Sequence, residues 1–191
     1  KKYGNINTWD TSLITDMSYL FNECNNFNDD ISNWDISNVK DMSSMFDKSL
    51  SFNQNIGNWD VSNVKYMNSM FYSAESFNQP IGNWDVSNVE DMVNMFGDSN
   101  FNQPLNNWDV SNVRNMGYMF KDATSFNQPL NNWNVSKVIN MNCMFNDAKL
   151  FNHNIGNWNV SNVKNMIGMF YDAKLFNQDL SLWDVSNVKD M

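Results

Sequence analysis

The stretch FNQPIGNWDVSNV occupies residues 77–89, and nearly the same residues return as FNQPLNNWDVSNV at 101–113 and as FNHNIGNWNVSNV at 151–163. The central tryptophan of each copy belongs to a series that runs through the chain: Trp9, Trp34, Trp59, Trp84, Trp108, Trp133, Trp158 and Trp183. The spacing is 25 residues except for one step of 24, because residues 96–102 are one residue shorter than residues 71–78. A fixed period of this length indicates a stacked repeat protein.

Each repeat divides into two halves with different apolar periods. Trp59 and Val61 are two residues apart and share a face in an extended chain, so they predict a short strand. The next half has apolar residues at offsets 0, 3, 6, 7, 10 and 13, which would span about 140° of a helix. These residues are Val64, Met67, Met70, Phe71, Ala74 and Phe77. We therefore predict one short strand, one short helix or helical turn and a return segment per repeat, with the strands paired in parallel as a continuous sheet.

The composition excludes several classes of function. The formal net charge is −9, with 12 lysines and arginines against 21 acidic residues, so nucleic acid is not an expected partner. No apolar run approaches the 18 residues of a membrane span. Cys24 and Cys143 fall about five layers apart in a stack with a spacing of about 4.8 Å, which is too far for a disulfide. His153 is the only histidine, and no zinc or iron site, cofactor or catalytic group is expected.

With Ile81 included, the strand half reads I-x-x-W-x-V, the spacing of the leucine-rich-repeat core. The F-N-Q-P, N-W-D-V-S-N-V and M-x-x-M-F segments resemble the repeat of the BspA-like leucine-rich-repeat surface proteins over almost the whole chain. The resemblance implies an α/β repeat solenoid, a leucine-rich-repeat-like right-handed superhelix with a short parallel strand and a short helix per 25-residue turn. We expect a single domain over residues 1–191, with seven to eight repeats, as part of a longer array.

Three repeated residue types have both a structural and a functional interpretation. The tryptophans share the parity of the valines, which favours a core position over an exposed rail for sugar stacking, and their indole N–H groups would then need loop carbonyls as acceptors. The methionines favour core packing over a metal-binding box. The asparagines that follow phenylalanine favour a ladder that pairs backbone groups of the return segments. These asparagines are Asn28, Asn53, Asn78, Asn102, Asn127, Asn152 and Asn177.

An acidic column is the main candidate site. Aspartate follows the tryptophan in six repeats, as Asp10, Asp35, Asp60, Asp85, Asp109 and Asp184, and Asn134 and Asn159 take this position in two others. Stacked carboxylates repel one another, so a cation or a basic partner could bind there; calcium at Asp35, Asp60, Asp85 and Asp109 is the weak metal candidate. The alternative is that each aspartate accepts hydrogen bonds from its own loop.

The expected function is binding without catalysis. The resemblance implies a secreted or cell-surface protein, including a surface lipoprotein, that adheres to a protein or glycan on another cell or in the matrix. The expected contacts on the strand face are Asn58, Asp60, Asn83, Asp85, Asn107 and Asp109. The alternative is a structural fibre, stalk or surface-layer component that assembles head to tail through the ends of the solenoid.

Overall fold

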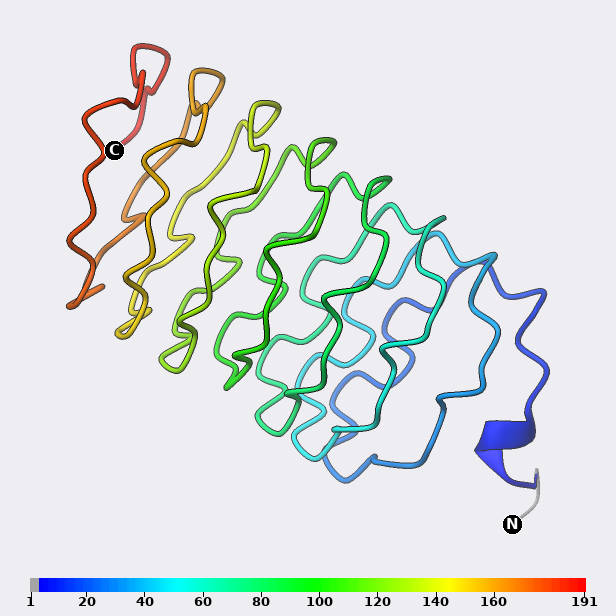
Figure 1. Ribbon diagram of the computed structural model, residues 1–191. Helices are drawn as coiled ribbons and strands as arrows, with labels where there is room; N and C mark the ends of the chain where they lie inside the picture. The colour runs from blue at the N-terminus through cyan, green and yellow to red at the C-terminus, as the bar shows by residue number, and fades with distance from the viewer. Residues whose placement is uncertain (1–3) are drawn as a thin grey trace.

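The chain forms a stack of similar coils, one for each sequence repeat (Figure 1). The computed structural model describes residues 4–191. Along these residues the only helix is the 3₁₀ helix η1 (Ile6–Thr8), near the N-terminus. Neighbouring coils are joined by isolated parallel bridges, one per pair of coils, that run from Asp16 through Tyr66 and Asn115 to Asp190. No helix in the described part of the chain is long and apolar enough to cross a membrane.

The predicted α/β class is therefore wrong. The bridges are isolated and do not extend into strands, so there is no continuous sheet. They also lie at Tyr66 and its equivalents, beyond the Trp59–Val61 segment where the strand was expected. The segment predicted as a helix contains two residues in the left-handed region, Ser69 with a φ of 54° and Ser73 with a φ of 50°. An α-helix cannot continue through such residues.

The apolar spacing of three residues comes from β-turns instead. Backbone hydrogen bonds close six turns in the repeat around Trp59, and in five of them both outer residues are buried. The bonds of these five turns run from Trp59 N to Ile56 O, Val64 N to Val61 O, Met70 N to Met67 O, Ala74 N to Phe71 O and Phe77 N to Ala74 O. A turn places its first and fourth residues close together and its two central residues outside. Hence a chain of turns produces the same i, i+3 apolar pattern as a helix.

Along residues 67–71, every second backbone N–H donates a hydrogen bond to a carbonyl of the next coil. Met67 N donates to Asp91 O at 3.0 Å, Ser69 N to Val93 O at 2.7 Å and Phe71 N to Met95 O at 3.0 Å. The even-numbered residues Met70 and Tyr72 donate within their own coil. The backbone polar groups of this segment are thus shared between local turns and inter-coil bonds, which is the pairing that buried backbone requires.

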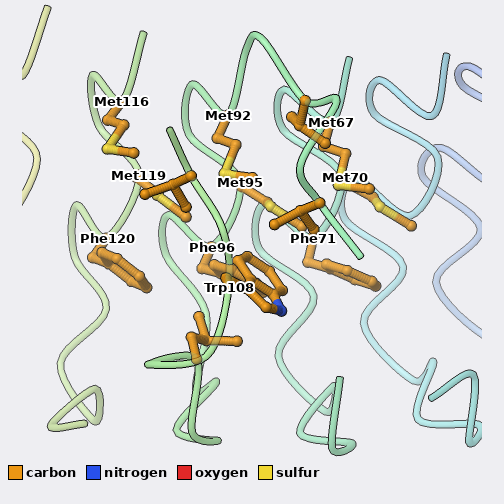
Figure 2. Close-up of a cluster of buried hydrophobic side chains, with 14 of the residues drawn as sticks. Met67, Met70, Phe71, Met92, Met95, Phe96, Trp108, Met116, Met119 and Phe120 are labelled. Atoms are coloured by element: carbon orange, nitrogen blue, oxygen red, sulfur yellow. The ribbon is translucent and has the colours of Figure 1, made fainter. Parts of the chain in front are cut away.

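The core is made of side-chain columns that run along the stack (Figure 2). Phe71 lies 5.7 Å from Phe46 and 5.8 Å from Phe96, and within its own coil it stacks on Phe77 at 3.9 Å between ring centroids. Met67, Met92 and Met116 form a second column, and Met70, Met95 and Met119 a third, all of them buried. The predicted core role of the methionines is confirmed, although no helix holds them.

The tryptophans are also core residues, as predicted. Trp34 to Trp158 are at most 5% exposed, whereas Trp9, in the first coil, is 46% exposed. Each indole N–H from Trp34 onward donates to a carbonyl of the preceding coil, as Trp108 Nε1 does to Ile81 O at 3.0 Å. The predicted loop carbonyls are therefore the acceptors.

The 24-residue coil keeps the register of the stack. Trp84 and Trp108 lie on either side of the shortened segment, with ring centroids 6.4 Å apart and planes at 2°. In two earlier coils, a backbone N–H of this segment donates a hydrogen bond to the preceding coil, as Ser76 N does to Leu50 O. The shortened coil lacks this backbone bond. In the short coil the Asn100 side-chain amide donates to Glu75 O at 3.0 Å instead. The shortened coil therefore leaves Trp84 and Trp108 stacked in line.

Candidate binding face

Every residue of the acidic column lies on the surface, next to a turn that it helps to close. Asp60 Oδ1 accepts hydrogen bonds from Ser62 N at 3.1 Å and from Ser62 Oγ at 2.6 Å. The same bond to the serine backbone N–H recurs at Asp10, Asp35, Asp85, Asp109 and Asp184. Asn134 and Asn159 make it too, at 3.2 Å. The hydrogen bonds of the column are therefore local, as the alternative interpretation requires.

The serine bonds also favour the ionised form of four aspartates of the column. The Ser87 hydroxyl, followed by its backbone N–H, lowers the pKa of Asp85, and serines act in the same way on the pKa of Asp10, Asp35 and Asp184. A hydrogen bond to a carboxylate stabilises its charged form. The charge of Asp10 raises the pKa of Asp35, but this effect is weaker than the hydrogen bonds. These carboxylates are consequently ionised at neutral pH.

The calcium candidates do not converge on one point. In residues 4–191 there is no group of three or more histidine, cysteine, aspartate or glutamate side chains placed to hold a metal ion. One oxygen of each candidate, Asp35, Asp60, Asp85 and Asp109, already accepts a bond from a serine. Calcium takes six to eight oxygen ligands, so further ligands would have to come from amides, carbonyls or water.

We call the expected partner contacts the acidic face: Asn58, Asp60, Asn83, Asp85, Asn107 and Asp109. All six are exposed, and they come from three consecutive coils. Farther along, Asn107 and Asp109 border a shallow hollow of about 340 Å³ whose other wall includes Asn132 and Asn134. The structure thus brings these residues together in a row, and their role in binding stays a prediction.

The asparagine ladder predicted after phenylalanine is present. Asn78 N donates to Asn53 Oδ1 at 3.1 Å, and the same contact links each member of the series to the next, from Asn28 to Asn177. Most of these amides are exposed. A glutamine two places after phenylalanine bonds to the same asparagine in four coils, and His153 Nε2 lies 3.1 Å from Asn127 O in another. The ladder therefore lies at the surface of the molecule, along the return segments.

A second amide ladder was missed by sequence reasoning. Asn63 Nδ2 donates to Ser37 O at 2.8 Å, and equivalent bonds are made by Asn38, Asn88, Asn112, Asn162 and Asn187. Lys137 takes this position in one coil, and its ammonium donates to Asn112 Oδ1 at 2.7 Å. The signal was available, because an asparagine recurs four residues after nearly every tryptophan.

Taken together, the repeated coils, the side-chain ladders and the repeated exposed face define a tandem-repeat protein. The chain matches the model of the family described as "Mycoplasma protein of unknown function, DUF285", over residues 1–103 and again over residues 97–191. It belongs to that family, and the predicted tandem repetition is confirmed. The BspA-like surface proteins are not the family that matches, so that resemblance stays a prediction. No curated protein and no solved structure matches the chain.

Proposed function

We propose that the protein is a non-enzymatic adhesion module, displayed on a cell surface or secreted, that binds a protein or glycan partner through the acidic face. The observation that carries the proposal is the repetition of one exposed polar motif on consecutive coils. Asp60 and its equivalents are held by two hydrogen bonds to serine in several coils, so they lose little conformational freedom when a partner binds. The resemblance to surface-protein repeats points to the same function.

The test is adhesion of beads coated with the purified chain to cultured host cells and to extracellular matrix. Asn83 and Asn107 are exposed, and the double variant Asn83→Tyr plus Asn107→Tyr covers the acidic face without changing its charge. We expect bead adhesion to fall by at least tenfold. The matched control is Asn26→Tyr plus Leu150→Tyr, at two exposed positions elsewhere in the coil, which should leave adhesion unchanged. Equal adhesion of all three proteins, or no adhesion of any, contradicts the proposal.

A second candidate is a structural fibre, stalk or surface-layer component built by end-to-end stacking. The last coil carries an apolar hollow of about 400 Å³ lined by residues that include Phe170, Trp183 and Val185. Its side chains belong to the columns that are buried between coils elsewhere, so a further coil, whether of the same protein or of a second copy, is an occupant of matching chemistry. Sedimentation velocity should then show rods that lengthen with protein concentration and that disappear in Val185→Glu. A monomer at all concentrations contradicts this candidate.

A further inference from the structure

Basic residues gather in one column of this acidic chain. Position six after the tryptophan is occupied by Lys40, Lys65, Arg114, Lys164 and Lys189, which are five of the 12 lysines and arginines. In the described coils the backbone N–H of each residue at this position bonds to the coil before, as Lys65 N does to Lys40 O at 2.8 Å. Their side chains are exposed. The column is separated from the acidic face by the turn that Val61 and Val64 close.

The middle of this column lacks the carboxylates that flank it elsewhere. The residue after the basic position is Asp16, Asp41, Asp91 or Asp190 in outer coils but Asn115, Asn140 and Asn165 in three consecutive coils. Asn134 and Asn159 replace the aspartates of the acidic column in the same region. Both changes retain the shape of the side chain and remove its charge.

Three cations occupy this neutral region, and we call Arg114, Lys137 and Lys164 the basic patch. Within residues 4–191 no carboxylate lies at ion-pair distance from any of the three, whereas Lys65 nearby is paired with Glu90 at 3.7 Å. The bond to Asn112 holds Lys137 at a polar hollow of about 270 Å³ that Arg114 also lines. The ion pair of Lys65 and Glu90 borders the same hollow, so the one carboxylate there is already paired with a lysine. Arg114 and Lys164 are two coils apart, about 10 Å for a stack with inter-chain spacing near 4.8 Å.

We propose that the basic patch binds an acidic polysaccharide aligned along the stack, an inference that goes beyond the proposed function because the basic patch is a second surface, separate from the acidic face. A few cations at intervals of one or two coils suit a polymer with sparse carboxylate or sulfate groups. The surrounding asparagine amides offer donors and acceptors for sugar hydroxyls. Ile139, 37% exposed between Arg114 and Lys164 in the column, offers an apolar contact for a sugar ring.

Two other polyanions fit less well. Duplex DNA carries one charge per about 1.7 Å, and three cations on a chain of net charge −9 would leave most of that charge facing repulsive carboxylates. Anionic membranes are typically bound by clusters of four to eight lysines and arginines, which exceeds the basic patch. A polymer of low charge density is thus the partner that these residues favour.

The experiment measures binding of the whole chain to a chondroitin sulfate dodecasaccharide and to hyaluronate, both of lower charge density than heparin, by calorimetry at low and physiological salt. We expect at least one of them to bind, and the triple variant Arg114→Gln, Lys137→Asn and Lys164→Gln to bind at least tenfold more weakly. Lys137→Asn restores the asparagine of the second ladder, so the variant should fold, as near-ultraviolet circular dichroism will show. The control triple, Lys48→Gln, Lys149→Gln and Lys174→Gln, has the same net charge and should bind within twofold of the wild type.

Several results would overturn the inference. They are no binding to either polysaccharide, equal losses in the two triple variants, or stronger binding to a thymidine oligonucleotide or to phosphatidylglycerol vesicles. Failure of this inference is distinguishable from failure of the proposed function. If neither polysaccharide binds but bead adhesion is lost in Asn83→Tyr plus Asn107→Tyr, the adhesive function stands and only the polysaccharide is excluded.

Discussion

Each buried tryptophan contributes apolar surface and one directed hydrogen bond. Trp108 is 2% exposed, and its indole N–H donates to Ile81 O at 3.0 Å. Trp108→Ala leaves a cavity and removes one of the two hydrogen bonds that Ile81 O accepts, the other coming from Trp84 N. We therefore expect it to lower the free energy of unfolding by about 3–5 kcal/mol. Trp183→Ala, in the partly open last coil, should cost clearly less. Urea denaturation of both variants measures the difference, and equal small losses would contradict the core role.

The contributions of Asp85 and Asp91, two aspartates of one coil, to the stability of the fold should depend on pH in opposite directions. Burial raises the pKa of Asp91, whereas the Ser87 hydroxyl and N–H lower the pKa of Asp85. A raised carboxyl pKa means that the folded state binds the proton more tightly, so the contribution of Asp91 to stability is lost as pH rises from the ordinary value of 3.8 through the folded value. The contribution of Asp85 is present above 3.8 and is lost as pH falls through its lowered value.

Relative to wild type, Asp91→Asn should therefore become more stable as pH rises from about 3 to about 7, and Asp85→Asn less stable. Asparagine already stands at the position of Asp91 in three later coils and at the position of Asp85 in two, so both variants are expected to fold. Thermal melts across this pH range give the two differences. If the stability of both variants relative to wild type changes with pH in the same direction, the environments of Asp85 and Asp91 do not have opposite effects.

At the scale of the element, the β-turn replaces both helix and strand. Asp147 is the third residue of the turn that Phe145 and Ala148 close, and its φ is 56°. Left-handed backbone is costly for a β-branched residue but not for glycine. Asp147→Val should lower the free energy of unfolding by about 1–3 kcal/mol, whereas Asp147→Gly, which removes the same charge, should change it by less than about 1 kcal/mol.

The control for this turn is Asn146→Val, one residue earlier, where φ is not positive. It should cost less than Asp147→Val when both are compared by chemical denaturation. If the two valine variants are equally destabilised, the left-handed conformation of Asp147 is not the reason for the loss of stability.

The sequence was sufficient to predict which residues are buried but not the backbone that buries them. Val64, Met67 and Met70 are all in the core, as their spacing indicated. However, a helix and a series of turns both place residues three apart on one side, and the period cannot distinguish them. The left-handed positions carry ordinary residues such as Tyr118, Cys143 and Asp147, and in residues 4–191 a glycine has a positive φ only at Gly4 and Gly168, so the usual glycine signal was missing.

The candidate site was predictable to a similar extent. The acidic column and the first amide ladder follow from single repeated residues. The basic patch does not, because Lys137 lies outside the basic column in the sequence, and only the structure places its ammonium on Asn112 and at the hollow that Arg114 lines. Repetition along the chain is visible in the sequence. The structure adds the register between coils, that is, which residues of neighbouring coils lie side by side.

At the scale of the whole molecule, the net charge of −9 and the stacked carboxylates oppose the compact state. At physiological ionic strength, salt screens the repulsion between exposed charges that lie farther apart than about 8–10 Å. The chain should therefore become more stable as sodium chloride rises from about 0.01 to 0.5 M, and the increase should be smaller in Asp60→Asn plus Asp85→Asn. Thermal melts measure both.

Calcium provides the matching control for this double variant. If one millimolar calcium stabilises the wild type far more than sodium chloride of equal ionic strength, and does so less in the variant, the column binds the ion specifically. If the two salts act equally at equal ionic strength, the carboxylates only repel one another and are screened.

The bonds between coils have a mechanical consequence. They join one coil to the next without forming long paired strands, so a pull on the two ends would load the bonds of an outer coil first. The chain should then peel one coil at a time at low force. Each step would release about 25 residues, or roughly 80–90 Å of extended chain. A tethered molecule of this kind would lengthen under flow in even steps, absorbing the load while its remaining coils stay attached to their partner.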